Sequence, residues 1–421
     1  MRDILSADAR GWRFVEDQIR ACLKSTGYEE IRLPMLEFKE LFSRSVGEAT
    51  DIVEKEMYNL SDRDGEDITL RPEGTAGCVR ALLENGLIYN QSQRVFYSGE
   101  MFRYERPQKG RYRQFYQIGA EAIGLSGPEV DAELIDIASK TWAALGIEDH
   151  LQLELNNLGS PEARNQYKTC LLEYLRPLMG QLDRDSQRRF DTNPLRILDS
   201  KNTDTQALLE DAPLLSDFVD ANSKERFDSL CRILVELKIP YIVNPRLVRG
   251  LDYYSDTVFE WSTDQLGAQG TVCGGGRYDG LVELLGGKRT PAAGFAIGLD
   301  RVVLLYQEVH GEFGESSKFN AKVDIYVCCL DSNNQPDAMK LSSQLREELT
   351  GLSIRNDLSG GKLKNQLRRA DQSGARIAIL VGPEEIEAGT LTVKYLKGEA
   401  PQETDEFGNM LKALQKYFGL F

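Results

Sequence analysis

The chain has 421 residues, of which 41% are hydrophobic and 28% are charged, and its formal net charge at pH 7 is −15. This length predicts two or three domains, and this composition excludes a chain that is disordered throughout. The acidic charge argues against broad nucleic-acid binding, so an RNA partner would have to dock on local basic patches. The sequence contains no apolar run long enough to span a bilayer and no signal peptide, which predicts a cytoplasmic protein without a membrane partner.

Cysteine and histidine usage restricts the possible chemistry. Seven cysteines are scattered without a Cys-x-x-Cys pair, and the histidines are His150 and His310. A zinc site, a disulfide framework and a catalytic Ser–His or Cys–His pair are therefore disfavoured. We predict no metal site built by protein side chains, and we expect the chemistry to depend on Arg, Glu, Gln and Tyr.

The first part of the chain predicts a helix followed by short strands. Apolar residues at helical spacing predict a helix over 3–26, and a strand is expected over 29–36, where Pro34 requires an edge or a bulge. Two strands are predicted within 58–70. In the next segment, 69–75, Pro and Gly end the strand, and a helix is predicted to start near 75. The acid of this segment, Glu73, either caps the helix or receives a substrate ammonium.

Residues 102–124 contain the most informative sequence motif of the chain. Strand-like runs at 94–105 and 113–123 flank a loop with Pro107 and Gly110, which is typical of a β-hairpin with a long loop. The loop region is basic, and guanidinium groups beside an aromatic ring suit a polyphosphate nucleotide, although a solvated hairpin is the alternative. Gln117 and Glu121 share one face of the second run, so that face is not expected to be a plain apolar core.

The middle of the chain contains a predicted helix and strand, a helical insertion and two further motifs. We expect a helix over 128–145, a strand over 151–158 and a polar helical insertion over 160–238. In 247–254 an Arg precedes Gly and two tyrosines, which by itself is compatible with a turn packed by aromatics. In 274–280 three glycines permit a tight turn and close backbone approach to a ligand. An apolar strand over 292–297 then leads into a helix that begins at 298.

The last hundred residues predict a separate small domain. A polar segment at 311–322 has the composition of a linker. Beyond it, strands at 323–330, 353–358 and 375–381 alternate with helices at 335–349 and 362–373, which indicates an α/β domain. The second helix carries a basic patch formed by Lys362, Lys364, Arg368 and Arg369.

The segments at 69–75, 102–124, 247–254, 274–280 and 298–301 resemble the motifs of histidyl-tRNA synthetases, a family of class II aminoacyl-tRNA synthetases. The resemblance covers essentially the whole chain and implies an α+β fold. A class II antiparallel-sheet catalytic domain is expected at 1–318, with the helical insertion at 160–238, and an α/β anticodon-binding domain at 322–421. The implied activity joins L-histidine to ATP with Mg²⁺ and transfers histidine to the 3′ end of tRNA(His). Family members form homodimers with the equivalent of Pro34 at the interface, and they usually carry a short segment before the equivalent of Met1.

The resemblance also implies roles for individual residues. Arg103 and Arg249 would be catalytic at the α-phosphate. Histidine would be bound by Glu73, Gly74, Thr75, Arg103, Gln117, Glu121, Arg249, Tyr253, Tyr254 and Tyr278. ATP would be bound by Arg103, Glu105, Arg111, Arg113, Phe115 and Arg301. The acceptor end of tRNA would meet Arg106 and Gln108. The chain departs from the common pattern at Tyr116, where many members have His, and at Asp300, where Glu is common.

Two other functions compete with this interpretation. A regulatory paralogue, the synthetase-like subunit of ATP phosphoribosyltransferase, binds histidine as a signal, lacks the carboxy-terminal domain and loses ATP-contacting arginines. This chain keeps residues 323–421 together with Arg103, Arg113 and Arg301, which favours the synthetase. An RNA-binding module without catalysis is disfavoured by the acidic charge and by the intact Arg249 peptide.

Overall fold

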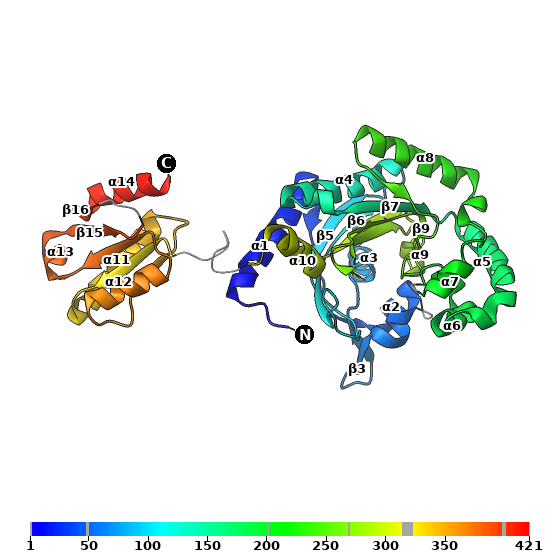
Figure 1. The fold of residues 1–421 in the computed structure, drawn as a ribbon, viewed down its shortest axis with the longest axis horizontal. Coiled ribbons are helices and arrows are strands. Elements are labelled where there is room, and N and C mark those ends of the chain that lie inside the picture. Colours follow the sequence, from blue (N-terminus) through cyan, green and yellow to red (C-terminus); the bar gives the residue numbers. More distant parts are fainter. Residues whose placement is uncertain are drawn as a thin grey trace. The chain divides into compact units, whose positions relative to one another are not determined.

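A computed structural model of the chain describes residues 2–47, 50–200, 202–267, 270–313, 323–397 and 401–420. The chain divides into two compact units, Met1–Phe313 and Gly314–Phe421 (Figure 1). The predicted linker from 314 onward, and the predicted domain boundaries at 318 and 322, lie outside the described residues. Each unit is considered by itself below.

The first unit is built on one large sheet. Within the described ranges, eight strands pair in the order β1-β5-β6-β11-β10-β9-β7-β8. The strands are β1 (Glu29–Glu30), β5 (Gln93–Phe102), β6 (Gln114–Ile123), β7 (Gln152–Asn157), β8 (Ile242–Val243), β9 (Ser255–Ser262), β10 (Thr271–Arg277) and β11 (Ala292–Gly298). The six central strands are antiparallel to their neighbours, and β1 and β8 add parallel pairings at the two edges.

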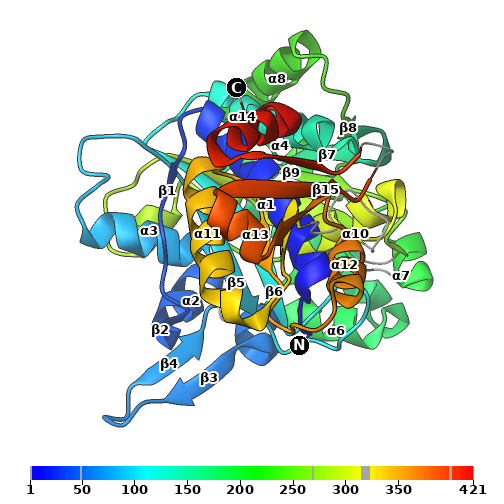
Figure 2. The ribbon, with the colours of Figure 1, turned by 90° about the vertical axis from the view of Figure 1, so that its left-hand side faces the viewer.

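One layer of helices covers the large sheet (Figures 1 and 2). Helices α4, α8 and α10 contact its strands, and α1 packs against α4 and α10. Their bounds are α1 (Ser6–Ser25), α4 (Pro128–Leu145), α8 (Ala221–Glu236) and α10 (Leu299–His310). Helix α4 has Pro128 in its first turn and ends at Gly146, whose φ of 64° lies in the left-handed region that favours glycine.

The predicted insertion is helical, with α5 (Pro161–Leu175), α6 (Arg184–Thr192) and α7 (Thr203–Leu208) preceding α8. Each of these four helices begins at a residue whose side chain accepts a backbone N–H of the first turn. The capping residues are Ser160, Asp183, Asn202 and Asp220. These caps define where the polar sequence becomes helical, because they satisfy backbone donors that have no partner inside the helix.

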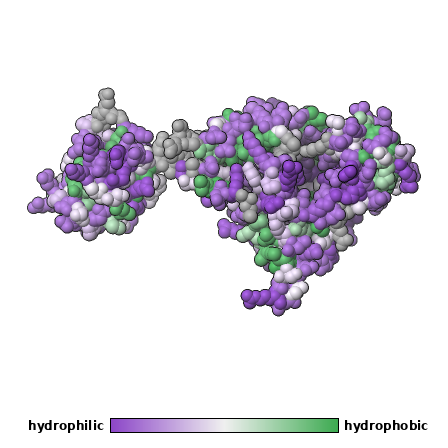
Figure 3. Space-filling view, turned by 60° about the horizontal axis from the view of Figure 1, so that its bottom comes forward, coloured by the Kyte–Doolittle hydropathy of each residue, from purple (hydrophilic) through white to green (hydrophobic). Residues whose placement is uncertain are grey.

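A small second sheet projects from the first unit. It pairs β2 (Leu36–Phe38), β4 (Asp67–Leu70) and β3 (Tyr58–Ser61), followed by α3 (Thr75–Glu84), while α2 (Lys39–Val46) and α9 (Leu281–Leu284) pack nearby. Figure 3 shows apolar side chains gathered beside the protruding hairpin on a mainly hydrophilic surface. The exposed apolar residues of these strands and their flanks are Met35, Leu36, Phe38 and Leu60.

The second unit is a sheet covered on both faces. Its described strands pair in the order β13-β12-β14-β15-β16. Their bounds are β12 (Ile325–Cys329), β13 (Ile354–Asn356), β14 (Ile377–Val381), β15 (Thr390–Tyr395) and β16 (Glu403–Glu406), and the helices are α11 (Gln335–Glu348), α12 (Leu363–Gln372), α13 (Pro383–Ala388) and α14 (Phe407–Phe418). Alternate residues of β12 enter two different apolar clusters, with Val327 in one and Tyr326 in the other, which explains why this strand is uniformly buried.

Three predicted elements need correction. The strand expected over 29–36 is interrupted between β1 and β2, because Pro34 has no N–H to donate to a neighbouring strand. The first strand of the hairpin ends at Phe102 rather than 105, so Arg103 and Glu105 lie in the loop. The glycines at 274–276 do not form a tight turn but run through β10, between β9 and β11. None of the described helices is long and apolar enough to cross a membrane.

Candidate active site

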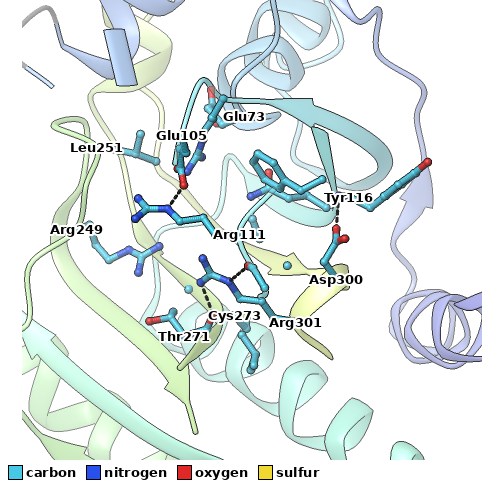
Figure 4. A pocket seen from close by; sticks show the side chains of 18 of the residues that line it. Glu73, Glu105, Arg111, Tyr116, Arg249, Leu251, Thr271, Cys273, Asp300 and Arg301 are labelled. Atoms are coloured by element: carbon cyan, nitrogen blue, oxygen red, sulfur yellow. Dashed lines mark hydrogen bonds and ion pairs between the residues drawn. The ribbon is translucent and has the colours of Figure 1, made fainter. Parts of the chain in front are cut away.

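A cleft of about 160 Å³ opens over β6, β10 and β11 in the first unit (Figure 4). Its walls come from the turn before α3, the loop between β5 and β6, the segment before β9 and the first turn of α10. Of the residues predicted to bind substrates, the cleft is lined by Glu73, Thr75, Arg103, Glu105, Arg111, Phe115, Gln117, Arg249, Tyr253, Tyr254 and Arg301. The fold therefore brings together segments that are more than two hundred residues apart in sequence.

Arg103 enters the cleft directly after β5. Its Nε donates to the carbonyl of Pro72 at 2.8 Å, and its Cζ lies 5.2 Å from the centre of the Phe115 ring. Burial lowers the pKa of Arg103, although Glu56 and Glu73 act in the opposite direction. Because the group that fixes Arg103 is a carbonyl rather than a carboxylate, the guanidinium keeps its capacity to pair with an anion.

Glu73 lies in the turn before α3. Its carboxylate accepts the backbone N–H groups of Thr75 at 2.7 Å and Ala76 at 2.9 Å, which is the geometry of a helix cap. Burial raises the pKa of Glu73, while these hydrogen bonds act to lower it. Glu73 thus satisfies two backbone donors at the start of α3, from the residue before the N-cap Gly74. Since the same carboxylate also lines the cleft, binding of a substrate ammonium stays a prediction.

Arg249 approaches the cleft from the segment before β9. One of its terminal nitrogens, Nη1, donates to Oε1 of Glu260, and its Cζ lies 5.6 Å from the centre of the Tyr254 ring. Burial acts to lower the pKa of Arg249, but Glu260 and the neighbouring tyrosines outweigh burial and raise it. Its Nε is buried without a hydrogen-bond partner among the described residues. Figure 4 shows the guanidinium turned into the cavity toward Arg111 and Arg301.

The loop between β5 and β6 contacts the first turn of α10. Arg111 donates to the carboxylate of Glu105, while Arg301 donates to the carbonyls of Gly110 at 3.1 Å and Thr271 at 2.6 Å. Burial, together with the charges of Arg103 and Arg111, lowers the pKa of Arg301 to about 10. The cleft thus gathers four arginines, Arg103, Arg111, Arg249 and Arg301, against the three carboxylates of Glu73, Glu105 and Asp300. In a chain that is acidic overall, this local excess of cations is an electrostatic setting for a polyphosphate.

Glu121 is fully buried behind the cleft lining. It accepts from the hydroxyls of Thr75 at 2.8 Å and Tyr97 at 3.2 Å, and from the hydroxyl of Tyr278. Burial raises the pKa of Glu121 to about 8. On β11, which pairs with β6, a side chain at Gly294 would overlap the Glu121 carboxylate, so glycine is required there by close approach.

Aromatic rings surround this buried carboxylate. The ring centre of Tyr253 lies 4.8 Å from that of Tyr254 and 5.6 Å from that of Tyr278. Nearby, Gln117 lines the cleft, and its Oε1 is buried without a partner in the described part of the chain. A polar pocket with unused hydrogen-bonding capacity thus adjoins the group of arginines, so a small polar ligand and a polyanion can bind side by side.

Comparisons with known proteins agree with this architecture. Residues 1–302 match the family model described as histidyl-tRNA synthetase, and residues 324–417 match the model described as anticodon binding domain. The chain belongs to the histidyl-tRNA synthetase family. The predicted class II catalytic domain and the C-terminal anticodon-binding domain are therefore confirmed.

Solved structures of this family have the same fold. The chain is 34% identical to histidyl-tRNA synthetase from S. aureus, with a TM-score of 0.80 and coverage of 98% of this chain and 97% of that one. A histidyl-tRNA synthetase from Nostoc sp. PCC 7120 is 19% identical, with a TM-score of 0.69 over 99% of this chain and 98% of that one. A Bacillus halodurans protein, titled as ATP phosphoribosyltransferase regulatory subunit/histidyl-tRNA synthetase, is 21% identical with a TM-score of 0.63 over 91% of this chain and 97% of that one.

Several predicted site residues lie outside the lining of the cleft. Arg113 places its guanidinium 4.1 Å from the centre of the Tyr104 ring instead of in the cleft. Arg106 and Gln108 are exposed at the tip of the loop. Gly74 precedes α3, where a side chain would overlap the ring of Tyr97. In the described ranges no hydrogen bond joins Glu121 to Tyr254, although both belong to the same pocket.

The family motifs also missed residues that the structure places at the site. Glu260 binds Arg249, and Thr271 both donates to Glu260 and supplies the carbonyl that holds Arg301. The sequence around Glu260 does not indicate which residue Glu260 binds, because its contacts depend on how β9 and β10 pair. Asp300 accepts the backbone N–H of Tyr116 at 2.7 Å, which defines its contact in this member of the family.

Proposed function

We propose that this chain is a histidine–tRNA ligase, which activates L-histidine with ATP to give histidyl-adenylate and pyrophosphate and then transfers histidine to the 3′ end of tRNA(His). The observation that carries this proposal is the convergence of Arg103, Arg111, Arg249 and Arg301 on a single cleft beside the Glu121 pocket. A histidine-binding protein without nucleotide chemistry has no need for this concentration of guanidinium groups. A class II synthetase needs it to bind ATP, which is the nucleotide that the family uses.

The first reaction would be an in-line displacement at phosphorus. The histidine carboxylate attacks the α-phosphorus of ATP, an oxygen–phosphorus bond forms, and the bond to the leaving pyrophosphate breaks. Arg103 and Arg249 would stabilise the charge that develops at the α-phosphate, and Arg111 and Arg301 would hold the leaving phosphates. The reaction then rests on positioning and fixed charge, because the substrate carboxylate is already ionised and no histidine lines the cleft.

Magnesium would enter as the complex of ATP and is therefore treated as part of the substrate. It would neutralise charge on the phosphates. In the described part of the chain, no three His, Cys, Asp or Glu side chains lie together as a metal-binding group.

Histidine would occupy the pocket beside the arginines. Glu73 and Thr75 lie where they can receive its α-amino group, and Gln117 offers an unpaired acceptor at the cleft wall. Tyr253, Tyr254 and Tyr278 would surround the imidazole ring, with Glu121 as the buried acceptor. A site that satisfies a polar substrate edge with buried groups rejects analogues that leave those groups unpaired.

Transfer to tRNA would use both units. The terminal ribose of tRNA attacks the carbonyl of the adenylate, and AMP leaves. Arg106 and Gln108 are exposed on the loop beside the cleft and would meet the acceptor end. The second unit would contact the anticodon, since it matches the anticodon-binding family and carries basic residues on and beside α12.

A homodimer is proposed on the small projecting sheet. Leu36 and Phe38 of β2 and Leu60 of β3 are about half exposed, at 49%, 56% and 50%. Neighbouring apolar side chains left in water indicate a surface that another chain covers. The interface predicted around Pro34 lies directly before β2, so both observations point to the same surface.

The competing function is regulation of ATP phosphoribosyltransferase. The second unit does not separate the two functions, because the Bacillus halodurans protein described as a regulatory subunit/histidyl-tRNA synthetase is similar over 91% of this chain. The arginines of the cleft support the ligase, since a subunit that only senses histidine has no phosphate to bind. The test is exchange of labelled pyrophosphate into ATP. Exchange that requires histidine supports the ligase, and histidine binding without exchange would favour the regulatory subunit.

A further inference from the structure

Arg249, in the segment before β9, is held by an acid on that strand. Its Nη1 donates to Oε1 of Glu260 on β9, eleven residues further along the chain. Among the described residues, Glu260 is the acceptor to which the Arg249 side chain donates a hydrogen bond. The two side chains are largely buried, with exposed fractions of 17% for Arg249 and 20% for Glu260. Solvent therefore competes little for this pair, and its geometry is defined by the protein.

The carboxylate of Glu260 is itself fixed from the neighbouring strand. Its second oxygen, Oε2, accepts from the hydroxyl of Thr271 on β10 at 2.9 Å. Glu260 and Gly274 are direct partners in the β9–β10 register. One oxygen thus binds the adjacent strand and the other binds Arg249, so the carboxylate has little freedom to turn.

Gly274 lets the guanidinium lie against the strand. A Cβ at this position would come within 2.4 Å of both terminal nitrogens of Arg249. The Tyr254 ring lies on the Arg249 side chain as well, with 5.6 Å between the ring centre and Cζ. The guanidinium is therefore confined by the backbone of β10, by a ring and by a carboxylate, while the cleft remains open beside it (Figure 4).

The other arginines of the cleft explain why the Arg249 guanidinium needs to be held in place. Arg103, Arg111 and Arg301 line the same cleft and repel a further cation before any phosphate has bound. Glu260 offsets this repulsion, and it keeps Arg249 in place in the free protein. A guanidinium that is already in position need not reorganise when charge develops on the α-phosphate.

We propose that Glu260, braced by Thr271, is a positioning residue that aims Arg249 at the α-phosphate during formation of the adenylate. This inference rests on the proposed ligase function. It predicts that Glu260 acts on the rate of the chemical step through Arg249 and does not act on substrate binding by itself.

The test is a double-mutant cycle with Glu260→Gln, Arg249→Ala and the double variant in pyrophosphate exchange. Glu260→Gln has nearly the same volume but lacks the charge, so kcat is expected to fall about 10- to 100-fold, as for a misplaced catalytic group, with KM for ATP and histidine changed less than about threefold. In the Arg249→Ala background, Glu260→Gln should have no further effect on kcat, because the residue through which it acts is gone. Additive losses would overturn the proposal, as would an unchanged kcat in Glu260→Gln.

Two further variants separate positioning from folding. Glu260→Asp keeps the charge but withdraws it by one methylene, so a positioning role predicts that it does not restore kcat, whereas a purely electrostatic role predicts recovery. Thr271→Val removes the hydrogen bond from the Thr271 hydroxyl to Glu260 and leaves the ion pair of Glu260 with Arg249. This variant tests the positioning role if Glu260→Gln does not fold. A lower kcat with unchanged melting temperature supports the proposal, and wild-type kcat overturns it. Absence of exchange in the wild-type protein would instead refute the ligase function itself.

Discussion

Replacement of Glu121 by Gln tests the histidine pocket with little change in shape. Three hydroxyls, from Thr75, Tyr97 and Tyr278, converge on the Glu121 carboxylate in the interior. Gln keeps an acceptor oxygen and similar volume, so the packing around it should survive. Truncation to Ala would leave all three hydroxyls buried without their acceptor, and that variant would mix specificity with folding.

The size of the expected effect follows from the interaction that is lost. The assay is run above about pH 8, where Glu121 is ionised; a hydrogen bond to a charged group contributes about 1.5–3 kcal/mol, which corresponds to about 10- to 150-fold in affinity. If Glu121 accepts from the imidazole of the substrate, KM for histidine should rise in Glu121→Gln by a factor in this range. KM for ATP should change less than about twofold, because Glu121 does not line the arginine cleft.

The assay is pyrophosphate exchange, with histidine titrated at saturating ATP and ATP titrated at saturating histidine. Tyr97→Phe is the matched control, since it removes one donor to Glu121 and leaves the carboxylate in place. The control should change KM for histidine much less than Glu121→Gln does. An unchanged KM for histidine in Glu121→Gln, or an equal rise in both KM values, would refute the reasoning.

Three further predictions concern the domains and the buried charges. Deletion of residues 323–421 should spare adenylate formation and damage charging of tRNA; loss of both in a deletion variant that remains folded and dimeric would contradict separate roles. The pKa of Glu121 is about 8 in the folded protein against 4.5 ordinarily, so its contribution to stability is complete below about pH 4.5 and is lost as pH rises through about 8. Chemical denaturation should therefore show Glu121→Gln gaining stability relative to wild type between about pH 5 and pH 8, and a constant difference would argue against the raised pKa. Arg277 is fully buried and donates to Asp131 at 2.9 Å, so Arg277→Met should reduce the free energy of unfolding by about 3–5 kcal/mol, with recovery when Asp131→Asn is added.

The hairpin and its loop were predictable from local pattern. Alternation over 94–105 and 113–123 located β5 and β6 to within three residues at each end, because both the strand period and the loop residues are local signals. The helices of the insertion were predicted as a group, and their boundaries depend on side-chain caps. Strands β8, β9, β15 and β16 were not predicted.

The glycines of β10 show where local pattern fails. Three consecutive glycines favour a turn by themselves, but here they provide space for groups from other segments of the chain. Gly274 accommodates Arg249, and a side chain at Gly276 would come within 2.4 Å of the Thr257 carbonyl on β9. Such a requirement becomes visible only when the strand order is known.

The roles assigned to single residues came from the resemblance, and the contacts between them could not be predicted. Glu121 and Tyr278 were named for one pocket, yet their hydrogen bond requires β6 and β10 to be brought together across β11. The pairing of Arg249 with Glu260 depends in the same way on the strand register. Arg113 shows the reverse case, since it matches the motif but packs on Tyr104 outside the cleft.

The most direct test of the central claim is detection of the adenylate itself. Purified protein is mixed in molar excess with labelled histidine and the magnesium complex of ATP, without tRNA, and the quenched mixture is separated. We expect the labelled histidine to accumulate on the protein as histidyl-adenylate, up to the amount of histidine added, and to pass into aminoacylated tRNA when tRNA(His) is added. Histidine that binds to the protein but is recovered unmodified in the presence of ATP would contradict the account.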